Sequence, residues 1–290
     1  MTNAPRPIQF LVSPGKRLVL LFLLMICGLF ATVLLTAILS GLIPPEKARA
    51  AARISTVIQD VLMLIAPAII TAVLVTRLPA RLLAIDRGPG LLPSVLAVVV
   101  LIIASPFMSV IIEWNASVHL PESMSGIEQS LRAMEDRAGN AVLFMLGDHS
   151  VANLIMNLLI VAVLAGVSEE LFFRGALQRL LGTTALSPTA AVWIAAILFS
   201  AVHFQFFGFV PRMLLGVYFG YLLLWSRSVW LPVIAHTANN AMYVVLQYTT
   251  GNGEPDLGQS GSGAAAIVAS VLLTAAGLWY IRRLLTNTEE

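Results

Sequence analysis

Long apolar runs recur through this chain of 290 residues. The first extends from Leu18 to Ile43, and the others approach the roughly 17–25 residues that an α-helix needs to cross the hydrocarbon core of a bilayer. Such runs are too long for membrane β-strands, and lipid admits only helices or closed barrels as spanning structures. We therefore predict an all-α fold, a polytopic transmembrane helical bundle.

About eight spans are expected from these runs. They cover residues 18–43, 57–76, 91–112, 151–181, 187–205, 212–226, 229–249 and 264–281. The first run is longer than the roughly 7–15 apolar residues of a signal peptide, so it is expected to remain as a span. The fourth is unusually long and is expected to tilt or to project beyond the lipid.

The composition indicates a membrane protein and excludes one class of partner, nucleic acids. Hydrophobic residues make up 58% of the chain and charged residues 11%, whereas a soluble domain carries about 25% charge. The net charge of +2 and the absence of a Lys/Arg run predict no nucleic-acid partner. Cys27 is the only cysteine, so no disulfide can form within one chain.

The basic residues predict how the chain is oriented. With the N-terminus in the cytoplasm, eleven Lys and Arg residues fall on inside segments and six on outside segments, as the positive-inside rule requires. We expect a multi-pass protein of a bacterial cytoplasmic (cell) membrane with both termini in the cytoplasm. Residues 113–150 then form a polar outer segment in which Pro121 to Ala138 are predicted to be a surface helix. Asp60 is expected at the outer start of the second span, where an interfacial acid costs little.

Polar residues inside the later spans stand at helical spacing. Three pairs are four residues apart: Glu170 and Arg174, Phe199 and His203, His236 and Asn240. Residues at this spacing lie one above the other on a helix face, whereas Glu169 is rotated from Glu170 by about 100°. An ionisable group at membrane depth costs roughly 2.5–3.5 kcal/mol. We therefore expect these side chains to converge on one site in the bundle core, although each pair alone is also compatible with a structural role.

These residue types are those needed to activate water. Glu170 and Arg174 are predicted to form an ion pair, which leaves Glu169 as a general base. His203 and His236 can orient the water or protonate a leaving amine, and Asn240 can offer its amide to a developing oxyanion. The outcome would be hydrolysis of a peptide bond inside the membrane.

A metal-assisted route stays open as an alternative. The imidazoles of His203 and His236, together with Glu169 and Asn240, can instead ligate a divalent metal such as zinc that activates the water.

The ordered motifs resemble those of the CPBP intramembrane proteases, which include the CAAX prenyl endopeptidase and the bacterial Abi proteins linked to bacteriocin immunity. That family's pattern is EExxxR, FxxxH and HxxxN, and the three pairs match it in order between residues 169 and 240. The resemblance implies a glutamate-dependent endoprotease with Glu169 as base, His203 as second catalytic residue, and His236 and Asn240 completing the site. It also implies a cavity open to the cytoplasmic side and a peptide or protein substrate at the membrane. The family's common name, metalloprotease, leaves the cofactor undecided.

Three segments follow from this interpretation. Residues 1–150 hold three spans and the polar outer segment, residues 151–250 the CPBP-type catalytic core with four spans, and residues 251–290 a loop and the last span. The main alternative is a non-proteolytic membrane scaffold or bacteriocin-immunity-type protein on the same fold. A transporter is less well supported, because the sequence has no internal repeat and no paired broken helices. The chain also lacks the HExxH and Gly-x-Gly-Asp motifs of other intramembrane proteases, and Ser168 is followed by Glu169 instead of the glycine of a Gly-x-Ser-Gly motif.

Overall fold

The all-α prediction is confirmed. The computed structural model describes residues 8–251 and 263–287, and within these ranges it contains helices and no strand. The helices are α1 (Pro14–Leu42), α2 (Ala48–Gln59), α3 (Ala66–Val75), α4 (Pro79–Leu82), α5 (Leu91–Ala116), α6 (Ser125–Leu146), α7 (Val151–Asn157), α8 (Ala165–Glu170), α9 (Arg179–Leu181), α10 (Pro188–Ala201), α11 (Phe209–Ser226), α12 (Trp230–Thr250) and α13 (Ala264–Thr286). Two of the long helical segments are not α-helical throughout. The π-helical stretch Asp60–Ile65 joins α2 to α3, and the stretches Leu158–Leu164 and Leu171–Gln178 lie on either side of α8.

Each of the eight predicted spans is occupied by helix, and the chain is a multi-pass membrane protein. Six helical segments of the described residues are long and apolar enough to cross a bilayer: Pro14–Leu42, Pro45–Val75, Leu91–Ala116, Val151–Leu181, Phe209–Ser226 and Ala264–Thr286. The helix Pro188–Ala201 is apolar but shorter, and α12 is not among the six, so the count of eight stays a prediction. The predicted surface helix is α6, which continues to Leu146. Residues 252–262 of the predicted loop lie outside the described residues.

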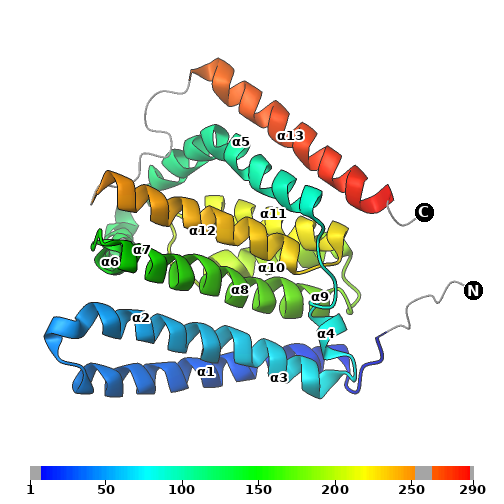
Figure 1. Ribbon diagram of the computed structural model, residues 1–290, viewed down its shortest axis with the longest axis horizontal. Coiled ribbons are helices and arrows are strands. Elements are labelled where there is room, and N and C mark those ends of the chain that lie inside the picture. Colours follow the sequence, from blue (N-terminus) through cyan, green and yellow to red (C-terminus); the bar gives the residue numbers. More distant parts are fainter. Residues whose placement is uncertain (1–7, 252–262, 288–290) are drawn as a thin grey trace, which may run out of the picture.

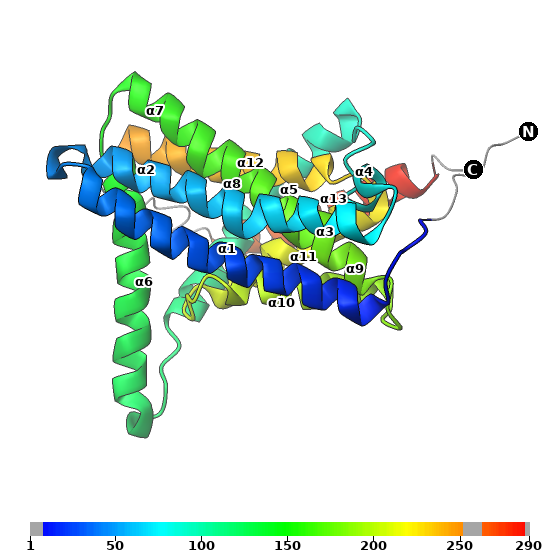
Figure 2. The same ribbon diagram turned by 90° about the horizontal axis from the view of Figure 1, so that it is seen from below.

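The helices form three layers (Figure 1). On one face, α1 packs along α2 and α3, and on the opposite face α13 packs along α5. The middle layer contains α7 to α12, in which α8 contacts α12 and α10 contacts α11. Helix α6 runs across the direction of the long helices at the end of the bundle away from the start of α1 and the end of α13 (Figure 2). All the predicted site residues lie in or next to the middle layer, between the two outer ones.

The outer helices present apolar side chains outward. Phe30 on α1 is 69% exposed and Leu272 on α13 is 65% exposed. Water would penalise such a surface, whereas lipid does not, because the bilayer core is as apolar as the side chains. The buried core instead includes Phe172, Phe173 and Leu177, at most 2% exposed, which follow the acidic pair directly.

Local signals in the sequence determine where α10 begins and where α11 ends. Ser187 caps α10 by accepting a hydrogen bond from the Ala190 backbone N–H at 3.1 Å, and Pro188 follows at the first helical position, where its missing N–H costs nothing. Helix α11 ends at Ser226, and the next residue, Arg227, has a left-handed φ of 55° that stops the helix.

Close packing of α10 against α11 depends on two glycines of α11. A Cβ on Gly216 would lie 3.0 Å from the Ala196 Cβ, and one on Gly220 would lie 2.8 Å from the Val192 Cγ1. The GxxxG spacing thus brings the two helix backbones together, and it keeps α10, which ends near His203, against α11 within the middle layer.

Candidate active site

A fully buried ion pair lies at the centre of the site. The Arg174 Nη1 donates to the Glu170 Oε1 at 2.8 Å, and both side chains are 0% exposed. The Arg174 Nη2 also donates to the Gly216 carbonyl at 3.0 Å, and the guanidinium carbon lies 4.5 Å from the centroid of the Phe199 ring. The predicted ion pair is present. Because the guanidinium is also bonded to a carbonyl and stacked on an aromatic ring, its desolvation is offset by more than one contact.

His236 connects the two glutamates. Its Nδ1 lies 2.8 Å from the Glu170 Oε1, and its Nε2 lies 3.7 Å from the Glu169 Oε2. A carboxylate accepts hydrogen bonds, so the proton of the neutral ring is on Nδ1 and the Nε2 lone pair faces Glu169. A separation of 3.7 Å is too long for a good direct hydrogen bond and suits a water that contacts both groups. Glu169, expected to lack a partner, thus has one across a short gap.

His203 joins the cluster through Phe199. It follows α10 directly, and its Nδ1 lies 2.7 Å from the Phe199 carbonyl oxygen. The carbonyl can only accept, so Nδ1 carries the proton and Nε2 is the nitrogen left for chemistry. The Phe199 ring packs edge-on against both imidazoles, with centroid distances of 5.2 Å to His203 and 6.0 Å to His236. Phe199 therefore acts as the spacer between the two histidines.

Asn240 is bound to the backbone of the neighbouring helix. Its Nδ2 donates to the Val161 carbonyl at 3.2 Å, and its Oδ1 accepts from the side-chain Nδ2 of Asn239 at 3.2 Å. A carboxamide has two N–H donors, so one remains for another acceptor. The side chain also ties α12 to the π-helical stretch that precedes α8.

The metal alternative has a weaker geometric basis. Within residues 8–251 and 263–287, no group of three or more His, Cys, Asp or Glu side chains is arranged to hold a metal ion. The Nδ1 of His236 is hydrogen-bonded to Glu170, and the Nδ1 of His203 is hydrogen-bonded to the Phe199 carbonyl. Histidines that bind a metal through one nitrogen commonly make such a bond with the other, so this feature alone is compatible with a metal. Glu169, His203 and His236 therefore do not form a metal-binding triad among the described residues.

Asp60 is a further acid close to the candidate site, and it is buried by the protein. It was expected at the membrane interface, yet it is 5% exposed at the start of a π-helical stretch. Its carboxylate is close enough to Glu169 for an electrostatic interaction, and its Oδ2 is buried without a hydrogen-bond partner among the described residues. Short π-helical stretches are frequent at functional sites, but no sequence motif includes Asp60.

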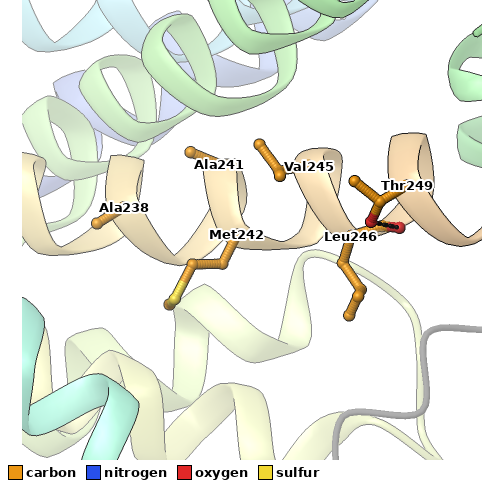
Figure 3. Close-up of a pocket in the computed structure, with 6 residues that line it drawn as sticks. All are labelled: Ala238, Ala241, Met242, Val245, Leu246 and Thr249. Carbon is orange, nitrogen blue, oxygen red and sulfur yellow. Dashed lines mark hydrogen bonds between the residues drawn. The ribbon is translucent and has the colours of Figure 1, made fainter.

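An apolar groove of about 570 Å³ runs along α12 and is separate from this cluster. It is lined by Ala238, Ala241, Met242, Val245, Leu246 and Thr249 (Figure 3). Val245 is nine residues after His236, which places it roughly 180° around the helix. The groove therefore lies on the opposite side of α12 from the imidazole and is not the candidate site.

Comparison with known proteins supports the motif assignment. Residues 151–242 match the family model described as type II CAAX prenyl endopeptidase Rce1-like. This segment belongs to the CPBP family. The match contains all three motifs of the CPBP pattern and leaves residues 1–150 and 243–290 outside. No curated protein and no solved structure matches the chain.

Proposed function

We propose that the chain is an intramembrane endopeptidase in which Glu169 activates water to hydrolyse a peptide bond. One observation carries the proposal: the Glu169 Oε2 and the His236 Nε2 face each other across 3.7 Å, with His236 oriented by the buried Glu170. A water beside this pair, within hydrogen-bond distance of both atoms, would meet a carboxylate and a lone pair, both of which attract its protons. The membership of residues 151–242 in a protease family supports the same reaction class.

The proposed reaction needs one base, one acid and one oxyanion donor. The Glu169 carboxylate removes a proton from water as the water oxygen attacks the carbonyl carbon of the substrate. That proton, transferred by Glu169 or through His203, then protonates the departing amine. Asn240 donates its remaining N–H to the oxyanion. Glu170 and Arg174 support the reaction indirectly, because they fix the tautomer and orientation of His236.

The first prediction concerns Glu169. Glu169→Gln keeps the shape of the side chain and removes its basicity, so cleavage is expected to fall by about 10²–10⁴-fold. Proteomics of new peptide termini in membranes of cells with wild-type or variant protein measures this loss. Glu122→Gln, an exposed glutamate in the outer segment, is the matched control and should cleave as wild type does.

Equal abundance of the variants has to be verified by immunoblotting. If Glu169→Gln produces the same new termini as wild type at equal abundance, the protease proposal is wrong. A cellular phenotype retained by Glu169→Gln without any cleavage in wild type would favour the membrane scaffold or immunity protein.

A further inference from the structure

The loop that carries His203 is bound by residues from the predicted outer segment. Residues 202–208 connect α10 to α11, and within them Phe204 adopts a left-handed φ of 54°. The loop is short and strained at this residue, so its conformation depends on what holds it. Besides the hydrogen bond that Arg212 of α11 donates to Gln205, three groups of contacts do so, and two of them come from α5 and α6, which lie outside the matched family segment.

The first contact is made by Asn115, near the end of α5. Its side chain is buried, with the residue 4% exposed. Its Nδ2 donates to the Phe206 carbonyl at 3.3 Å, and its Oδ1 accepts from the Val210 backbone N–H at 2.7 Å. One carboxamide thus bonds both the loop and the first turn of α11. A buried amide that satisfies backbone groups in this way fixes their separation.

The second contact comes from α6. The Glu135 Oε2 accepts the Phe207 backbone N–H at 3.1 Å, and the Arg132 guanidinium lies 3.7 Å from the centroid of the Phe207 ring. Phe207 is itself 5% exposed. Helix α6 therefore holds the loop by a hydrogen bond to its backbone and by a cation–π contact to its side chain.

Helix α6 is in turn anchored to the end of α5. Glu128 accepts the Leu120 backbone N–H at 2.8 Å and bonds Arg132 at 2.9 Å. The Leu120 N–H, His119 and Arg132 hold the pKa of Glu128 at about 2, well below its usual range, so the carboxylate is ionised at neutral pH. Arg132 also donates to the Val118 carbonyl at 3.0 Å. This network gives α6 a defined position from which to contact the loop.

The third contact joins the two helices that flank the loop. The fully buried Ser200 donates its hydroxyl to the Phe209 carbonyl at 2.7 Å, which ties the end of α10 to the start of α11. His203 lies between Ser200 and the residues held by Asn115 and Glu135. Its ring is directed by the bond from Nδ1 to Phe199, so a shift of the loop would change the position of its Nε2.

We infer that Asn115 and Glu135 are positioning residues for His203, which makes the α5–α6 segment a part of the catalytic apparatus. The kinetic part of this inference rests on the proposed function, whereas the structural part does not. Neither residue touches the reacting atoms. Each acts by keeping the loop in the conformation that presents His203 to the site, and an error of about 1 Å in such a position can lower a rate by on the order of 100-fold.

Hydrogen–deuterium exchange on the purified full chain tests the structural part. Glu135→Ala and Asn115→Ala should each make the amides of residues 202–210 exchange roughly five- to tenfold faster, the scale of losing one hydrogen bond. Glu135→Gln keeps an acceptor oxygen and should restore slow exchange. Asp136→Asn, at the exposed next position of α6, is the matched control and should exchange as wild type.

Kinetics test the catalytic part, with a synthetic peptide that spans a cleavage site found in the Glu169→Gln comparison. Glu135→Ala should lower kcat by about 10–100-fold with KM unchanged, and Glu135→Gln should recover most of it. The inference is overturned by unchanged exchange in residues 202–210, by equal acceleration in α8 and α12, or by a normal kcat with a loosened loop. If the wild type cleaves nothing, the proposed function fails, and the exchange data alone decide whether the two residues hold the loop.

Discussion

Glu170 shows how a charge is kept in the apolar interior of this protein. One of its oxygens accepts from both Arg174 and His236 at 2.8 Å. Taking an ion out of water costs several kcal/mol, and removing only one partner leaves the other charge uncompensated. The sequence indicated the Glu170–Arg174 pair because four residues separate them on one helix. The bond to His236 could not be predicted, since 66 residues separate it from Glu170.

Arg174 compensates the charge of the buried Glu170. Arg174→Met is expected to destabilise the protein by about 3–5 kcal/mol, because the buried Glu170 loses its cation. The double variant Glu170→Gln/Arg174→Met should recover a large part of that loss, since it removes both charges. Thermal unfolding in detergent measures both, with the exposed Arg137→Met as control. Equal unfolding temperatures for Arg174→Met and wild type would contradict this account of the ion pair.

Among the elements, the crossing of α8 and α12 determines the site. A Cβ on Gly166 would lie 2.6 Å from the Thr237 Oγ1 and 3.1 Å from the Thr237 backbone nitrogen. Gly166 precedes Glu169 by one helical turn, and Thr237 follows His236. The absence of a Cβ at Gly166 therefore lets α8 and α12 approach closely next to Glu169 and His236.

The prediction for this crossing is that Gly166→Ala separates the two helices. We expect a loss of about 1–3 kcal/mol in stability from overpacking, together with reduced cleavage as Glu169 and His236 move apart. Thermal unfolding and the terminus assay measure the two effects. Gly139→Ala, on α6 with nothing within 4 Å of its Cβ, is the control, and it should be neutral or slightly stabilising because alanine favours helix. Full activity in Gly166→Ala would show that the spacing is not critical.

For the whole molecule, the arrangement of the helix ends bears on orientation. The start of α1 and the end of α13 lie at one end of the bundle, and α6 lies at the other (Figure 1). The distribution of Lys and Arg predicts that the first end is cytoplasmic. The orientation and the bacterial cell membrane both stay predictions.

Cysteine labelling in intact cells tests the orientation. Cys27 is the only cysteine of the chain, so Cys27→Ser provides a background without thiols. In this background, Gln129→Cys on α6 should react with a membrane-impermeant maleimide from outside, whereas Asn287→Cys should react only after permeabilisation. The reverse pattern would invert the predicted orientation.

The sequence by itself determined the features that depend on nearby residues. Apolar runs predicted the positions of the helices, and spacing of four residues predicted the ion pair and the motifs, because both patterns follow from the geometry of a single helix. Tertiary structure decided the rest: the placement of His236 between two glutamates, the burial of Asp60 near Glu169, and the contacts of Asn115 and Glu135 with the His203 loop. These contacts join helices far apart in the chain, and they depend on how closely the helices pack, which no local pattern encodes.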